Sequence, residues 1–474
     1  MKNKYKSFPL KAISVWSLSM VFLFVSCNKD VVSSPGYDGD IFEQTALTKA
    51  SDSDFKVYPP EVEWLVKNLY PELGDFEIEA YPDEENPLMY AVNFDEGWKI
   101  VSGDKRIDPI LAFSNEGKMI INDSTNPGFN IWLEEVSKSI LALDGIKDEY
   151  CKNLTFWKFE FPQKDDLQTK SGSGFWYREL VGEYVSGRYV NEIEPMLLTK
   201  WGQGYPWNQK APRCYSSSAN RCPLGCGPVA ISQLLYYYHF HDAAPQGLFH
   251  TIIGHEYGYN GLGYALFSIS RSDYTSPSNR WSLMPHDSTA ASANLTYTQY
   301  VGDLIIDVGD RLGVTYSDFS TGYDPDTDLE SLFLDFDLIS TSGEYNFNYV
   351  LNDLTNSRPV FIGGLPDNGV GHAWVIDGYR QDYLTTRRVY IWHEANSGWY
   401  GQTYTTSEAQ AMLGPYYTLR EGIGYQETTE GLGPKYFHMN WGLDGRDDGF
   451  YAFDASWLTY YTIKKIVYNI HATL

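Results

Sequence analysis

Residues 225–240, GCGPVAISQLLYYYHF, restrict the backbone more than any other stretch of this chain. Proline has a fixed φ and no backbone N–H, so it is favoured in the first turn of a helix and disfavoured further in. After Pro228 the apolar residues recur at helical spacing and form one face, namely Val229, Ile231, Leu234, Leu235 and Tyr238. The stretch therefore predicts a helix that begins near Cys226.

The predicted position of Cys226 favours a reactive thiol. At a helix N-terminus the backbone dipole and the unpaired N–H groups stabilise a thiolate, and a nearby imidazolium lowers the thiol pKa further from its free value of about 8.5. Gly225 and Gly227 leave room for a carbonyl group to approach. A lone cysteine before a helix is more often buried and inert. The reactive interpretation therefore requires a base close to the thiol. A metal site is a poor alternative because the chain has no CxxC motif.

A candidate base and its supporting groups follow at the right places. GVGHAWVIDGY puts His372 at the start of a predicted strand, and a helical cysteine followed much later by a strand histidine is the order of papain-like nucleophilic sites. YFHMNWGLDG supplies Asn440 to hold the second imidazole nitrogen and Trp441 to shield that bond from water. Upstream, KWGQGYPWN supplies Gln203, whose amide and the N–H of Cys226 would stabilise an oxyanion.

Taken in this order, the motifs WGQGYPWN, GCGPVAISQLLYY, GHAWVIDGY and HMNWG resemble the streptopain-type cysteine peptidases, a papain-like family of secreted bacterial proteases. The resemblance implies a nucleophile, a base, an oxyanion donor and a supporting pair, at Cys226, His372, Gln203 and Asn440 with Trp441. The segment AVNFDEGWKIVSGDKRIDPILAFSNEG, residues 91–117, resembles the inhibitory propeptide of the same family. We expect no cofactor and no metal ion.

Two departures from that family pattern concern the surroundings of the site. Relatives commonly read NWGWGG where this chain reads NWGLDG, so Leu443 and Asp444 replace a tryptophan and a glycine. The segment between His372 and Asn440 is also longer than in the archetype. We expect it to form an extra hairpin and a long loop near the site, which would alter specificity.

Length and charge limit the possible functions. A chain of 474 residues suggests two or three domains, and its 43% hydrophobic and 16% aromatic residues are enough to bury them. It has 36 Lys and Arg against 61 Asp and Glu, a net charge of −25, and no long basic block. Binding to nucleic acid or to an anionic bilayer by charge alone is therefore excluded as a function.

The first residues are typical of a targeting segment. Four lysines precede an apolar run at 13–25 that ends in LFVSC, which looks like a bacterial lipoprotein signal with Cys27 as the lipidated residue. The alternative is an ordinary secretion signal. We expect an exported protein whose membrane contact is a lipid anchor on Cys27, in the outer membrane or at the cell surface, with release by cleavage as a further option.

Composition divides the chain into five parts. We expect a signal peptide at 1–27, a flexible tether at 28–50 that is rich in Gly and Pro, and a small α+β propeptide domain at 51–165. A cleavable linker at 166–175 and a papain-like peptidase domain at 176–474 follow. Helical patterns early and strand patterns late predict an α+β fold, in which a helical part packs on an antiparallel sheet.

Several other polar residues favour structural interpretations. His438 alternates with Asn440, but a hydrogen-bonded sheet histidine is more common than a second base. Asp377 would point away from His372 on a regular strand. Cys214 and Cys222 flank a polar loop and suit a disulfide clip in an oxidising compartment.

The predicted function is a cysteine endopeptidase made as a zymogen, which hydrolyses proteins or peptides after a cut near 170–174 removes the propeptide. Three alternatives stay open. The same site would serve a cell-wall amide hydrolase or transpeptidase. In the second alternative the protein is a lipoprotein that binds ligands in the cleft without catalysis. In the third, the first domain inhibits other peptidases in trans.

Overall fold

A computed structural model describes part of this chain, residues 55–70, 72–122, 125–143, 174–213, 221–242, 252–259, 265–271, 280–318, 320–365, 371–395, 402–415, 418–453 and 463–473. All of these residues belong to one compact unit, residues 50–474. The predicted signal peptide with Cys27, the tether, Cys151, Cys214 and nearly all of the linker lie outside the described residues.

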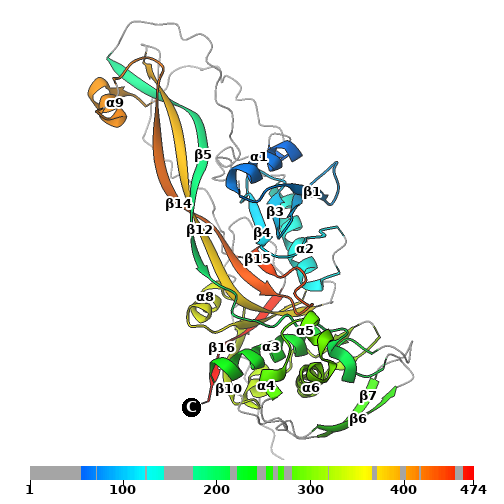
Figure 1. Cartoon of the computed structure of the whole chain (residues 1–474). Helices are drawn as coiled ribbons and strands as arrows, with labels where there is room; N and C mark the ends of the chain where they lie inside the picture. Colours follow the sequence, from blue (N-terminus) through cyan, green and yellow to red (C-terminus); the bar gives the residue numbers. More distant parts are fainter. Residues whose placement is uncertain are drawn as a thin grey trace, which may run out of the picture. The chain divides into compact units, whose positions relative to one another are not determined.

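The N-terminal domain, residues 55–143, is an antiparallel sheet with two helices (Figure 1). Its elements are α1 (Pro59–Leu69), β1 (Phe76–Tyr81), β2 (Met89–Phe94), β3 (Trp98–Ser102), β4 (Ile110–Ser114) and α2 (Pro127–Ala142). The turn between β2 and β3 requires a glycine, because Gly97 has φ +88° and a Cβ there would lie 2.5 Å from the carbonyl oxygen of Ser114. The domain therefore combines helices with an antiparallel sheet, as expected of the predicted α+β propeptide domain.

The helical part of the C-terminal domain, residues 174–473, contains the helix that the sequence predicts near Cys226. The helices are α3 (Cys226–His241), α4 (Arg280–Leu283), α5 (Ser288–Ala293), α6 (Leu295–Leu312) and α7 (Leu329–Leu334), with a 3-10 turn, η4, at Trp207–Lys210. Helix α3 packs against α6 and against the sheet. Eleven of its 16 residues are buried, including the whole apolar face predicted from the sequence.

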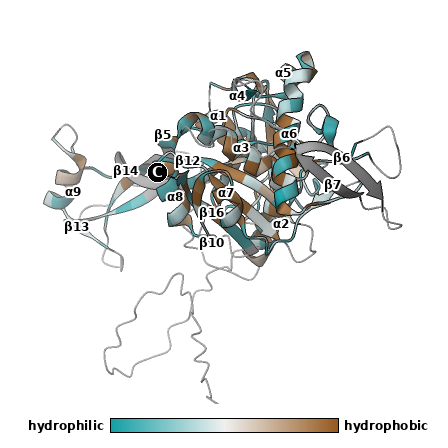
Figure 2. Cartoon of the chain, turned by 90° about the horizontal axis from the view of Figure 1, so that it is seen from below, coloured by the Kyte–Doolittle hydropathy of each residue, from teal (hydrophilic) through white to brown (hydrophobic). Residues whose placement is uncertain are grey.

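An antiparallel sheet separates two hydrophobic cores. It contains β10 (Leu338–Glu344), β11 (Val360–Leu365), β12 (His372–Glu394), β14 (Ile423–Asn440), β15 (Gly449–Ala452) and β16 (Ile463–Ala472). On β12, Ala373 and Val375 pack into the core with α3, whereas Trp374 and Ile376 pack into the core with α2 and with α8 (Phe347–Thr355). Brown segments in Figure 2 mark these hydrophobic elements. The predicted α+β class is confirmed.

Three strands continue beyond the cores as an arm, β5 (Phe175–Ile193), β12 and β14. Strand β12 has 23 residues and therefore extends roughly 70 Å at about 3.3 Å per residue. At its far end Trp176 and Trp392 form a small core with α9 (Thr406–Leu413), next to β13 (Tyr404–Thr405). The extra hairpin predicted between His372 and Asn440 is confirmed, but its tip lies away from His372, so the predicted loop near the site is wrong.

The two domains share one sheet and one core. Strand β4 pairs with β15, so that Phe113 lies opposite Phe450, and these two rings stack with centroids 5.1 Å apart. Trp132 of α2 donates its Nε1–H to the carbonyl oxygen of Ala452 over 2.9 Å. Lys464 of β16 forms a buried ion pair with Glu135 of α2. The N-terminal domain therefore completes the hydrophobic core of its neighbour.

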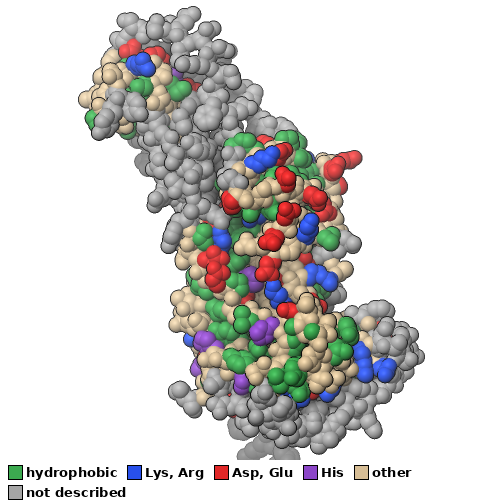
Figure 3. All heavy atoms as spheres, viewed as in Figure 1, with side chains coloured by type: hydrophobic (Ala, Val, Ile, Leu, Met, Phe, Trp, Pro, Cys, Tyr) green, Lys and Arg blue, Asp and Glu red, His purple; other side chains and the backbone are tan. Residues whose placement is uncertain are grey.

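Carboxylate side chains are prominent on the surface over α1 and β1 to β4 (Figure 3). Exposed members of this group include Glu84, Glu85, Asp95 and Glu96. The surface of this domain is thus predominantly acidic on that face, in line with the net charge of the chain.

We predict that Trp132→Ala lowers the free energy of unfolding of residues 28–474 by about 3–5 kcal/mol, the usual cost of deleting a buried tryptophan side chain. The change removes the hydrogen bond to Ala452 and the ring contact with Tyr451, whose centroid lies 5.0 Å away. Urea unfolding measures the effect. Trp64→Ala is the control, because Trp64 of α1 is 36% exposed. Equal effects of the two variants would contradict the shared core.

Candidate active site

Cys226 is the first residue of α3, as predicted, and it is a half-buried free thiol. Gly225 precedes it with φ +95°, a conformation that other residues rarely adopt. Gly227 follows, and a Cβ there would lie 2.5 Å from Cε1 of Tyr323. Both glycines are therefore needed to bring the thiol to the start of the helix, where the unpaired N–H groups favour a thiolate.

His372 is the first residue of β12 and is 4% exposed. The next backbone N–H, that of Ala373, donates to Sγ of Cys226 over 3.4 Å. Burial raises the pKa of the Cys226 thiol, but the charge and the hydrogen bond of His372, with the N–H groups of Ala373 and Gly227, outweigh it and hold the pKa below its usual value. The structure thus brings Cys226 and His372 into contact.

The carbonyl group of Trp441 holds the second nitrogen of the imidazole. His372 Nε2 lies 3.0 Å from the carbonyl oxygen of Trp441, which can only accept a hydrogen bond, so Nε2 carries the proton and Nδ1 is left for the thiol. The indole of Trp441 is fully buried and its ring centroid lies 6.4 Å from that of His372. Trp441 therefore both orients the imidazole and shields it from water.

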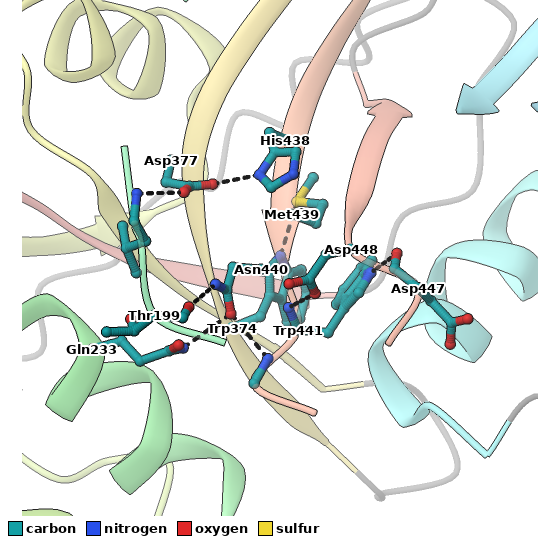
Figure 4. Close-up of polar contacts among 12 residues, drawn as sticks. Thr199, Gln233, Trp374, Asp377, His438, Met439, Asn440, Trp441, Asp447 and Asp448 are labelled. Carbon is teal, nitrogen blue, oxygen red and sulfur yellow. Dashed lines mark hydrogen bonds and ion pairs between the residues drawn. The ribbon is translucent and has the colours of Figure 1, made fainter. Parts of the chain in front are cut away.

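Asn440 does not contact His372, contrary to the prediction. Its Oδ1 accepts from Gln233 Nε2 over 2.9 Å, and its Nδ2 donates to the carbonyl oxygen of Thr199 over 2.9 Å (Figure 4). The register explains this. Asn440 lies opposite Val375 on β12, and residues opposite each other share a face of the sheet, so Asn440 points toward α3. His372 lies an odd number of residues away and belongs to the other face.

The main chain of Gln203 is hydrogen-bonded to the segment that leads into Cys226. Its carbonyl oxygen accepts the N–H of Leu224, two residues before Cys226, over 2.9 Å. Within the described part of the chain its half-buried side chain makes no hydrogen bond, so the amide is available to a ligand. Trp201 N–H donates to Gln233 Oε1 over 3.2 Å. The amide pair of Gln233 and Asn440 thus fixes the segment that carries Gln203.

Sequence reasoning missed Gln233. The sequence signal was an amide within the apolar run that forms α3. Such a position predicts burial, and a buried amide needs hydrogen-bond partners.

His438 is the ion-paired sheet histidine that was favoured over a second base. Its Nδ1 lies 2.6 Å from Asp377 Oδ1, and Asp377 Oδ2 accepts the N–H of Leu197 over 3.0 Å. Burial lowers the pKa of His438, but the charge of Asp377 and its hydrogen bond more than offset this and raise it. A register shift between Ile376 and Gly378 turns Asp377 toward His438, so Asp377 is no member of the Cys226 and His372 site.

Asp444, at the point where the chain departs from the family pattern, braces the Gln203 segment. Its Oδ1 accepts the Nε1–H of Trp207 over 2.6 Å, and its carboxylate lies against Gly202. Burial raises the pKa of Asp444, while the hydrogen bond from Trp207 lowers it less. The residue therefore packs on the loop before the nucleophile, where the family glycine has no side chain to do so.

The start of α2 covers the imidazole. A Cβ on Gly128 would lie 2.6 Å from Cδ2 of His372 and would overlap the indole of Trp441. Asn126 caps α2 by accepting the N–H groups of Gly128 and Phe129, and its Nδ2 donates to Asp447 Oδ2 over 3.2 Å. The N-terminal domain therefore meets His372 and Trp441 directly.

Other predicted features fall outside this cluster. Among the residues that the structure describes, no group of three or more His, Cys, Asp or Glu side chains could hold a metal ion. His239 stacks on Trp281 at a centroid distance of 4.4 Å, near the end of α3. Cys222 is buried, and the clip with Cys214 stays a prediction. The described helices include none that is long and apolar enough to cross a membrane.

We predict that His372→Ala raises the pH at which Cys226 becomes reactive. The imidazolium favours the thiolate and so lowers the thiol pKa, which means that its removal must raise the pKa. The rate of alkylation by neutral iodoacetamide, followed against pH in the linker-cleaved chain, measures the midpoint. Peptide mapping separates Cys226 from the other cysteines. An unchanged midpoint would contradict the contact between the two side chains.

Two protein families match parts of this chain. Residues 201–405 match the Peptidase C10 family and residues 43–140 match the Spi protease inhibitor family. The first match includes Gln203, Cys226 and His372, and the second includes Gly128. The thiol protease/hemagglutinin PrtT of Porphyromonas gingivalis is 23% identical over 329 residues, 65% of this chain and 33% of that protein. The chain thus spans about a third of the length of this relative.

Two solved structures are also similar to this chain. A fragment of Prevotella intermedia prointerpain A has 17% identity and a TM-score of 0.48, with 84% of this chain and 100% of that chain covered. The active interpain A cysteine protease of the same organism has 19% identity and a TM-score of 0.36, with 59% and 96% covered. The resemblance drawn from the four motifs is confirmed by the two family matches. The chain carries a Peptidase C10, or streptopain-family, domain at residues 201–405 and a Spi protease inhibitor domain ahead of it at residues 43–140.

Proposed function

We propose that this chain is the zymogen of an exported cysteine endopeptidase, in which Cys226 and His372 form the catalytic pair. The observation that carries the proposal is the contact of a free thiol at a helix N-terminus with a buried histidine whose other nitrogen is fixed. The match of residues 201–405 to the Peptidase C10 family supports the same activity. Protein or peptide substrates follow from this chemistry.

The reaction that this geometry supports is acyl transfer through a thioester. His372 takes the proton of the thiol, and the Cys226 thiolate attacks a peptide carbonyl. The N–H of Cys226 and the amide of Gln203 then stabilise the tetrahedral oxyanion. The imidazolium gives its proton to the leaving amine, and water hydrolyses the thioester. No step needs a metal ion.

The N-terminal domain would act as the intramolecular inhibitor. Its α2 begins against His372 and Trp441, so a substrate cannot reach the imidazole while the helix is in place. Removal of the domain after a cut in the predicted linker would open the site, as pro-segment removal does in general. Export and lipidation on Cys27 rest on the sequence of residues 1–27, and they would place the enzyme in the outer membrane or at the cell surface.

The first experiment is hydrolysis of casein and of fluorogenic peptides by residues 28–474, before and after limited proteolysis of the linker. We predict activity only after cleavage and none in Cys226→Ala, because that variant lacks the nucleophile. Inactivity of the cleaved, folded wild type would overturn the endopeptidase, and the same samples would then be tested on muropeptides for wall hydrolase or transpeptidase activity. Binding without turnover would favour a non-catalytic lipoprotein.

We also predict that Gly128→Ala raises the activity of the uncut chain. The added Cβ would lie 2.6 Å from the imidazole of His372, so the start of α2 has to move off the site. Hydrolysis of a fluorogenic peptide by the uncut protein measures the effect. The linker-cleaved and purified peptidase domain is the control, since it no longer contains residue 128 and must equal wild type. Unchanged activity of the uncut variant would show that α2 is not what blocks the site.

A further inference from the structure

Trp441, which orients His372, is itself held at two points. Its N–H donates to Asp448 Oδ1 over 2.9 Å, and its Nε1–H donates to the carbonyl oxygen of Asp447 over 3.0 Å (Figure 4). Its own carbonyl oxygen lies 3.0 Å from His372 Nε2. A single residue thus links the half-buried carboxylate of Asp448 to the imidazole of His372. The Asp448 carboxylate is the one side-chain group in this link that mutation can change without touching Trp441 or His372.

The backbone between Trp441 and Asp448 forms a turn that brings the Asp448 carboxylate back to Trp441. Four positions have positive φ, at Gly442 (70°), Asp444 (61°), Gly445 (77°) and Asp447 (59°). Left-handed residues reverse the chain sharply, and non-glycine residues adopt this conformation at a cost that the surroundings must offset. The turn brings Asp448, the residue before β15, back against the N–H of Trp441 at the end of β14.

The groups around Asp448 carry both signs of charge. His438 of β14 attracts the carboxylate, Asp377 of β12 repels it, and Lys200, which precedes Trp201, attracts it. Asp377 is paired with His438 over 2.6 Å, so Asp448 shares the charge of His438 with a second carboxylate. Lys200 also pairs with Glu116 of the N-terminal domain and loses that partner once the domain leaves. Asp448 therefore belongs to a partly buried cluster of charged groups next to Trp441.

We propose that Asp448 is a positioning residue for the proposed peptidase reaction. Its carboxylate anchors the main chain of Trp441, so that the carbonyl group of that residue holds Nε2–H of His372 and keeps Nδ1 directed at the Cys226 thiol. This rests on the proposed function of the Cys226 and His372 pair and adds the residue that maintains its geometry. A loosened Trp441 would leave the substrate-binding surface in place while the imidazole turns away from the thiol.

The hydrogen bond from the N–H of Trp441 to the Asp448 carboxylate depends on pH. Burial raises the pKa of Asp448 to about 7, with His438 and the N–H of Trp441 lowering it less. Above that pH the group is an anion and a strong acceptor for the N–H of Trp441. As the pH falls through this value the carboxyl becomes protonated and the hydrogen bond weakens. Activity should therefore fall on the acid side with a contribution from Asp448.

The test uses residues 28–474 after linker cleavage, with Asp448→Ala and Asp448→Asn. We expect Asp448→Ala to lower kcat about 100-fold, the scale of an Å-sized misplacement of a catalytic group. KM should change by less than about 3-fold, since the substrate-binding surface stays intact. Asp448→Asn keeps an acceptor oxygen without a titratable proton, so it should recover to within about 10-fold of wild type. Its acid limb should move to lower pH.

The matched control is Asp353→Asn. Asp353 is a buried carboxylate that likewise accepts a backbone N–H, that of Asn469, while pairing with Arg358. Its loss would reduce stability but should leave the pH profile unchanged. If Asp448→Ala fails to fold, Asp448→Asn still decides, because a wild-type pH profile in that variant overturns the proposal.

A second readout separates this proposal from the peptidase activity. The pH dependence of Cys226 alkylation by iodoacetamide reports the thiol and imidazole pair whether or not any peptide is hydrolysed. We expect Asp448→Ala to shift the alkylation midpoint upward, toward that of His372→Ala. A shift without hydrolysis in the wild type would uphold the positioning role and overturn the peptidase. If the wild type hydrolyses peptides but the alkylation midpoint is unshifted in both Asp448 variants, the peptidase is upheld and the positioning role of Asp448 is overturned.

Discussion

The contact between the start of α3 and the start of β12 is the constraint on which the rest of the site depends. A thiol at a helix N-terminus is reactive only if a base meets it, and here the meeting is made by the backbone, where the N–H of Ala373 reaches Sγ of Cys226. Helix α3 packs on β11 and β12, which fixes the angle between the two elements. Around them, the buried amides of Gln233 and Asn440 hold the Gln203 segment, and Trp441 holds the imidazole.

The same sheet explains how one domain controls the other. Its second face would be an exposed apolar surface with a free edge at β15, and the N-terminal domain covers that face with α2 and pairs that edge with β4. Exposed sheet edges and apolar faces favour association with other chains. The contact of Gly128 with His372 is therefore a consequence of core packing. His372 is the first residue of β12 and lies at the opposite end of that strand from the tip of the arm.

Local patterns were sufficient for some parts of the site and insufficient for others. Cys226 and His372 were identified because a proline, flanking glycines and apolar spacing mark the start of a helix, and alternation marks a strand. Asn440 was given the wrong partner because its face depends on the register between β14 and β12, including the shift near Asp377. Gln233 and Asp448 were missed because their partners are backbone groups and amides that adjoin them only after folding. The arm was predicted as a hairpin, but its direction was not.

The sequence by itself determined the helix that begins at Cys226, the strand that begins at His372, the order of the motifs and hence the family. These depend on spacing along the chain and on the conformations open to Gly and Pro, which need no distant partner. The tertiary structure alone decided which groups orient the imidazole, which face carries Asn440, and that α2 covers the site. Those features depend on strand register, on buried hydrogen bonds and on packing between segments far apart in the chain. One residue of register moves a side chain to the opposite face of the sheet.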